Sequence, residues 1–247
     1  MIEKQELTLS HSDGKPDAIG IEAVNRILRP VGVRISQVPV PTVAHPILKT
    51  SQEQAVPESQ HPELISTFNL DRDQLLEQIE LAGREAATHR GGLLSTSEHG
   101  VAPYPKVYDM RAMDSAARTA TLRRFGRLHI NSTDEGLGID EVMTVVYAGP
   151  LTWFFQLADG GVAKVSLPAV EIGDPAWRLS YPGLQPHGGF LDAEYGLVVA
   201  FAHGPEKFVM RYEHPNVEAE GAELLGTNPW VDFNGEVPRL LDDAIQN

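Results

Sequence analysis

The stretch 118–212 constrains the fold most, because it is a succession of short apolar runs separated by turns. The runs are rich in β-branched and aromatic residues, which favour strands. Two of the connections, residues 148–150 and 158–161, are too short for a crossover between parallel strands, so they predict antiparallel neighbours. The pattern indicates a mainly β protein, an antiparallel barrel or sandwich. We expect its strands at 141–147, 151–157, 162–167, 196–202 and 207–212.

The chain has 247 residues and is 42% hydrophobic, which is enough to bury a substantial core. We expect a β domain at 111–247 and a helical or irregular N-terminal extension at 1–110. Apolar spacing predicts a helix at 18–28 and another at 71–82, the second starting with an Asp71 and Gln74 capping box.

Other parts of the extension and the C-terminus have weaker patterns. A short strand is expected at 33–36, a proline-rich arm without regular structure at 41–62, and an irregular connection or lid at 90–108. Near the C-terminus, an edge strand at 230–233 and a short helix at 238–245 complete the prediction.

Charge and composition exclude several classes of protein. The formal net charge of −14 argues against a protein that coats nucleic acid or anionic lipid, because both need a positive face. The four arginines in 118–127 are interpreted as the charged face of an edge strand. Cysteine is absent, which excludes disulfides and thiolate sites. Without a spanning apolar run or a signal-peptide pattern, we expect a cytoplasmic protein that binds neither membrane nor nucleic acid.

Three side chains of the β region carry the chemistry that we expect. His129 precedes a polar loop, Glu141 opens a strand and His187 lies in a turn-rich segment. Side chains that project inward from neighbouring strands meet across a narrow cavity. Two histidines and one carboxylate suit Fe(II), Mn(II) or Zn(II), with positions left open for a ligand. The alternative is that each of the three is a structural, hydrogen-bonded residue.

The segment 128–208 resembles the cupin superfamily. Glu141, followed by a strand and Gly149, looks like the end of the first cupin motif, and Pro182 to His187 has the Pro-to-His spacing of the second. The histidine pair of the first motif is missing, because the matching positions fall on 134–137 and His129 lies further upstream. The resemblance implies a jelly-roll fold and a divalent metal held by His129, Glu141 and His187.

Two hypotheses about function follow. In the first, the protein is a metal-dependent dioxygenase or isomerase for a small anionic or carbonyl-bearing molecule, which Tyr181 or Arg178 orients. In the second, the barrel has no metal and is a small-molecule binding or structural module. A homodimer is expected in either case, because the strands within 142–157 are apolar on both faces and a barrel buries only one.

Overall fold

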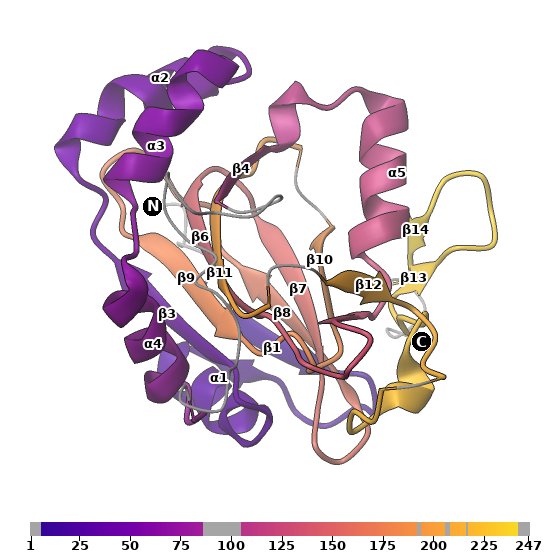
Figure 1. Ribbon diagram of the computed structural model, residues 1–247. Helices are drawn as coiled ribbons and strands as arrows, with labels where there is room; N and C mark the ends of the chain where they lie inside the picture. Colours follow the sequence, from indigo (N-terminus) through magenta and orange to yellow (C-terminus); the bar gives the residue numbers. More distant parts are fainter. Residues whose placement is uncertain (1–5, 86–104, 192–193, 206–207, 216, 242–247) are drawn as a thin grey trace.

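The computed structural model describes residues 6–85, 105–191, 194–205, 208–215 and 217–241 (Figure 1). Two five-stranded antiparallel sheets form its centre. The first sheet contains, in spatial order, β10 (His187–Leu191), β7 (Leu151–Gln156), β8 (Val162–Leu167), β1 (Thr8–His11) and β2 (Ala18–Ile19). The second contains β3 (Arg34–Val38), β9 (Ala176–Tyr181), β6 (Asp140–Tyr147), β11 (Leu197–His203) and β4 (Lys106–Asp109).

Two small strand pairs and several helices surround these sheets. The pairs are β5 (Ile130–Ser132) with β12 (Val209–Arg211) and β13 (Val231–Asp232) with β14 (Arg239–Leu240). The α-helices are α1 (Ile21–Leu28), α2 (His45–Glu53), α3 (His61–Thr67), α4 (Arg72–Leu81) and α5 (Ser115–Phe125). The 3-10 helices are η1 (Arg29–Val31), η2 (Thr42–Ala44), η3 (Glu58–Gln60), η5 (Met110–Ala112) and η6 (Ala222–Leu224).

The main core lies between the two sheets. Trp153 and Val165 contribute to it from the first sheet, and Met143, Leu179 and Ala200 from the second. Inward residues alternate with outward ones along each strand, as expected for sheets packed face to face. The described strands form open sheets, not a closed barrel. The prediction of a mainly antiparallel β structure is therefore confirmed.

The turn after β6 was interpreted incorrectly. β7 and β8 pair antiparallel as predicted, but β6 and β7 belong to different sheets. Ala148 pairs with Val170, and the chain then passes through Gly149 and Pro150 into the opposite sheet. A short connection can therefore join the two layers of a sandwich as well as two neighbours in one sheet.

The N-terminal third contains more helix than the sequence predicted. The capping box of α4 is confirmed, because Asp71 Oδ1 accepts a hydrogen bond from Gln74 N and Gln74 Oε1 accepts one from Asp71 N. The expected arm at 41–62 is wrong, since α2 and α3 begin there. Pro46 and Pro62 occupy the first turns of these helices, where a missing N–H costs nothing.

The arginine-rich segment forms α5 and not the expected edge strand. Asp114 caps the helix by accepting a hydrogen bond from Ala117 N at 2.8 Å. Leu122 and Phe125 pack against the protein, while the arginines spread around the helix. The expected C-terminal helix is also wrong where it is described, because Arg239–Leu240 forms β14.

Large apolar residues on the outer faces of both sheets are covered within the chain. Val142 and Val146 of β6 lie in a cluster with residues of α2, α3 and α4, which pack along the second sheet (Figure 1). Phe154 of β7 packs with Leu128 and Trp230. This removes the argument for a homodimer, which stays a prediction.

Strands from both sides of residue 110 share each sheet. β1 pairs with β8, and β3 pairs with β9. Most of the predicted lid, residues 86–104, lies outside the described residues, and its last part is β4. None of the described helices has the length and apolar character needed to cross a membrane.

Candidate functional site

Four of the five predicted site residues meet at one end of the space between the sheets. Alternation along β6 directs Glu141 inward, beside its strand partner Tyr181 of β9. His187 begins β10 in the opposite sheet, and His129 precedes β5. All four are buried, with exposed fractions of 2–3%. We refer to these residues together with Asn131 as the inner polar cluster.

His129 and His187 are held together by their backbones as well as their rings. Each donates a backbone N–H to the carbonyl of the other at 3.0 Å. Their ring centroids are 4.5 Å apart, and the ring of Tyr181 lies 4.6 Å from that of His187. The fold thus fixes the two imidazoles with little freedom to separate.

The acidic and amide groups complete the cluster. His187 Nε2 lies 3.2 Å from Glu141 Oε2, and Asn131 Nδ2 lies 3.2 Å from the same oxygen and 3.4 Å from the same nitrogen. His187 Nδ1 faces the carbonyl of Gln185 at 2.7 Å, so Nδ1 carries a proton.

Burial alters the acid–base properties of the other two groups. The pKa of His129 is lowered well below its ordinary value, first by burial and then by the nearby His187. Its Nδ1 donates to the carbonyl of Arg127 at 2.8 Å, so the neutral ring carries its lone pair at Nε2. The pKa of Tyr181 is raised well above its ordinary value, by burial first and then by Glu141. His129 is a neutral base and Tyr181 a neutral phenol near pH 7.

The cluster as arranged does not fit a metal ion. Among the described residues, no group of three His, Asp or Glu side chains is placed to hold one. The Asn131 amide, which is a donor, points at both atoms that would have to offer lone pairs, Glu141 Oε2 and His187 Nε2. What the arrangement shows directly is a set of buried polar side chains in contact with one another.

The structure separates Arg178 from the cluster and adds Asn131 to it. Arg178 is two residues from Ser180 on β9 and projects to the outer face of the sheet, where its Nε donates to Thr144 Oγ1 at 3.1 Å. Asn131 was interpreted as part of a polar loop, yet it lies in β5 and is buried. The short Ile130–Ser132 sequence alone carries too weak a strand pattern to reveal this.

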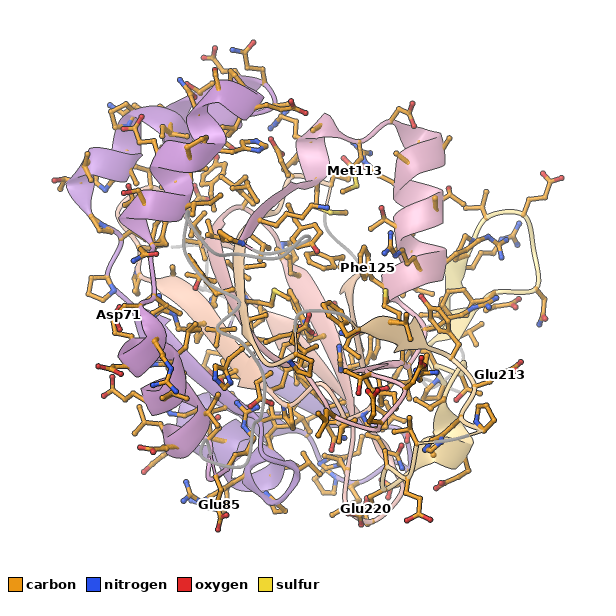
Figure 2. The ribbon with its side chains drawn as sticks, viewed as in Figure 1. Asp71, Glu85, Met113, Phe125, Glu213 and Glu220 are labelled. Carbon is orange, nitrogen blue, oxygen red and sulfur yellow. The ribbon has the colours of Figure 1, made fainter. Side chains whose placement is uncertain are left out.

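A hollow of about 350 Å³ lies beside α5, and we call it the α5 hollow. Residues of β4, η5 and α5 line it, together with His61 of α3. Met113, just before α5, and Phe125, its last residue, both line the hollow and are labelled beside α5 in Figure 2. The Phe125 ring also lies 6.5 Å from the ring of His129, so the hollow and the inner polar cluster are adjacent.

The α5 hollow carries two cations over aromatic rings. Lys106 Nζ lies 4.7 Å from the centroid of the Tyr108 ring, and Arg124 Cζ lies 5.2 Å from that of Phe125. Burial and then the charge of Arg124 lower the pKa of Lys106. The carboxylate of Asp109 also lines the hollow, but it accepts backbone hydrogen bonds from residues 56 and 111 at 2.7 and 3.0 Å. The two cations are therefore left without a carboxylate partner among the described residues.

Comparison with known proteins adds no family to this description. No protein-family model matches the chain, and no curated protein matches it.

Proposed function

We propose that this protein is a metal-independent, cupin-like jelly-roll module that binds a small anionic molecule in the α5 hollow. The observation that carries the proposal is the pair Lys106 and Arg124, two cations over aromatic rings in a hollow of about 350 Å³, neither of which has a carboxylate partner among the described residues. Hollows of this size suit small ligands. A ligand with a carboxylate and a flat apolar part matches both kinds of lining.

The inner polar cluster lies next to the α5 hollow and holds one of its walls in place. Glu141, His187 and Asn131 contact one another through polar atoms at 3.2–3.4 Å. Phe125 and His129 join the cluster to the wall of the hollow. The cluster therefore helps to fix the position of Phe125 in the wall of the hollow.

Titration of small aromatic carboxylates, with benzoate and phenylacetate as first probes, tests the proposal by calorimetry. Lys106→Met and Arg124→Met should each weaken binding about tenfold, because each removes a charge-assisted contact. Lys49→Met, a change of an exposed lysine on α2, is the matched control and should bind like the wild type. Equal binding by all the variants would refute the site.

Metal analysis separates this proposal from the metal-dependent enzyme that the sequence predicted. Protein purified from medium supplemented with iron, manganese and zinc should hold none of them in stoichiometric amount. One metal per chain that disappears in His187→Ala would overturn the proposal in favour of a metal-dependent dioxygenase or isomerase. In that case His129, Glu141 and His187 would be the ligands.

A further inference from the structure

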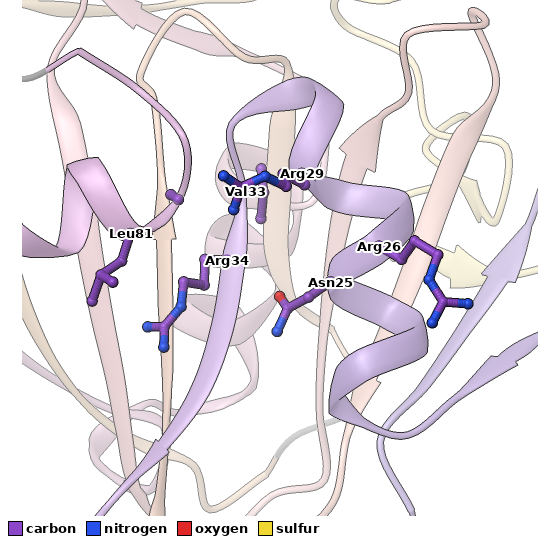
Figure 3. A pocket seen from close by; sticks show the side chains of 7 residues that line it. Asn25, Arg26, Arg29, Val33, Arg34 and Leu81 are labelled. Atoms are coloured by element: carbon purple, nitrogen blue, oxygen red, sulfur yellow. The ribbon is translucent and has the colours of Figure 1, made fainter.

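A second pocket, separate from the α5 hollow, lies between α1, β3 and the end of α4 (Figure 3). Its volume is about 180 Å³, and three arginines, Arg26, Arg29 and Arg34, contribute to its lining. In Figure 3, Arg34 lies between Leu81 and Asn25, while the head group of Arg26 points away from the other two arginines. We refer to this site as the arginine pocket.

The arginines of this pocket have no ion-pair partner in the part of the chain that the structure describes. Across the described ranges, neither Arg29 nor Arg34 forms an ion pair or a side-chain hydrogen bond, although the chain as a whole has a net charge of −14. The positive potential extends further, because Arg178 lies close by. Its pKa is lowered to about 10, first by burial and then by the charge of Arg34. Like charges gathered in this way favour occupation by an anion.

The backbone around the pocket is fixed in advance. Asn25 of α1 donates from Nδ2 to the carbonyl of Ile35 at 2.7 Å and accepts from Ile35 N at 2.7 Å. These two bonds set α1 against β3, so the backbone at Arg34 and at Arg29, which directly follows α1, is held in place without a ligand. Such preorganisation lowers the cost of binding.

We propose that Arg29 and Arg34 bind the phosphate group of a small phosphorylated molecule or free phosphate. Planar guanidinium groups match the oxygens of a tetrahedral anion with paired donors. At about 180 Å³ the pocket admits one charged group, with any organic part left at the rim beside Leu81, which is 44% exposed. This site is independent of the one proposed in the α5 hollow.

Titration of the full chain with inorganic phosphate and with phenyl phosphate, in chloride buffer of low ionic strength, tests the inference. Both should bind saturably. Arg34→Ala should weaken binding about tenfold, and the double change Arg29→Ala with Arg34→Ala should abolish it. Arg34→Lys keeps the charge but loses the planar fork, so its affinity should fall between those of the wild type and Arg34→Ala.

Two controls keep the result specific. Arg72→Ala removes an exposed arginine side chain at the start of α4 and should leave the affinity for phosphate unchanged. Lys106→Met disables the α5 hollow and should leave inorganic phosphate binding intact, so the two sites can fail separately. In the Lys106→Met protein, tighter binding of phenyl phosphate than of inorganic phosphate identifies a phosphorylated organic ligand. Equal affinity for the two probes identifies phosphate itself.

Non-saturable binding, or equal affinity in the wild type and Arg34→Ala, would overturn the site. If Arg34→Ala is unstable, arginine Nε–H resonances of the wild type provide the readout. Phosphate should shift the signals of Arg29 and Arg34 and leave that of Arg72 in place. Unmoved signals of Arg29 and Arg34 would also overturn the inference.

Discussion

His129 and His187 exchange two backbone hydrogen bonds of 3.0 Å, one in each direction, although 58 positions separate them in the sequence numbering. The same contact places their rings 4.5 Å apart in a region with almost no exposure to water. Two imidazolium charges at that distance would repel strongly in such surroundings. Burial and the neighbouring His187 accordingly lower the pKa of His129 well below its ordinary value.

Acid should destabilise the protein partly through His129. Its pKa in the folded state lies well below the ordinary value of 6.5, so the unfolded chain takes up this proton first as the pH falls. The stability that the neutral ring contributes is fully present above about pH 6.5 and is lost progressively below it. His129→Gln should flatten the dependence of the unfolding free energy on pH between about 7 and 5. The unfolding free energy of both proteins is measured by urea denaturation across that pH range. Equal slopes of this free energy against pH in the two proteins would contradict the assignment.

Glu141 should tolerate an amide better than a truncation. In Glu141→Gln, an amide oxygen in the place of Oε2 can still accept from Asn131 Nδ2, and the side chain still fills the same space, so we expect a small loss of stability. Glu141→Ala leaves both neighbours buried and unpaired, at about 1–3 kcal/mol for each lost group. Chemical denaturation of the two variants measures the difference, and equal losses would show that the hydrogen bonds do not matter.

Arg84 should be sensitive to truncation because it is buried against the outer side of β6. Its Nη1 lies 2.8 Å from Asp140 Oδ1, and its Nη2 donates to Ser180 Oγ at 2.6 Å. Arg84→Ala leaves the Asp140 carboxylate buried at 1% side-chain exposure, and breaking such a pair costs about 3–5 kcal/mol. Arg26→Ala, a change of an exposed arginine on α1, serves as control and should cost far less. Similar unfolding midpoints for the two variants would refute the role given to this pair.

Trp230 should contribute to stability as the cover of the outer face of β7. It is 2% exposed, and its ring centroid lies 5.8 Å from that of Phe154. Trp230→Ala should cost about 3–5 kcal/mol, as for other large buried aromatic residues. The newly exposed apolar face should also promote association, so light scattering beside thermal unfolding is the measurement. A stable variant that stays at the wild-type mass would show that this cover is dispensable.

The sequence predicted the strands well where composition alone decides them. β6, β7, β8 and β11 are runs rich in β-branched and aromatic residues and bounded by turns, and these residue types are enriched in strands. The placement of β6 and β7 in different sheets was not predictable, because it depends on which surfaces the whole chain can cover. α5 was missed because its arginines obscured the helix signal of its alanines and the Asp114 cap.

The candidate site was predicted in part for a related reason. The shared interior position of four residues was predictable, because strand alternation and the resemblance to cupins both point there. These residues are His129, Glu141, Tyr181 and His187. Asn131 was missed, since its burial depends on β5 being folded over the ends of β6 and β10. Its amide is also what makes the arrangement unsuited to a metal.

The two adjacent carboxylates of β6 have a consequence for strand register. Asp140 meets Arg84 on one side of the sheet, and Glu141 meets His187 on the other. A slip of β6 by one residue would reverse these directions and place each carboxylate, without its partner, in the wrong environment. Apolar residues on both faces of this strand would tolerate the slip far better. The acidic pair at the start of β6 thus allows only one alignment of the central strand of the second sheet.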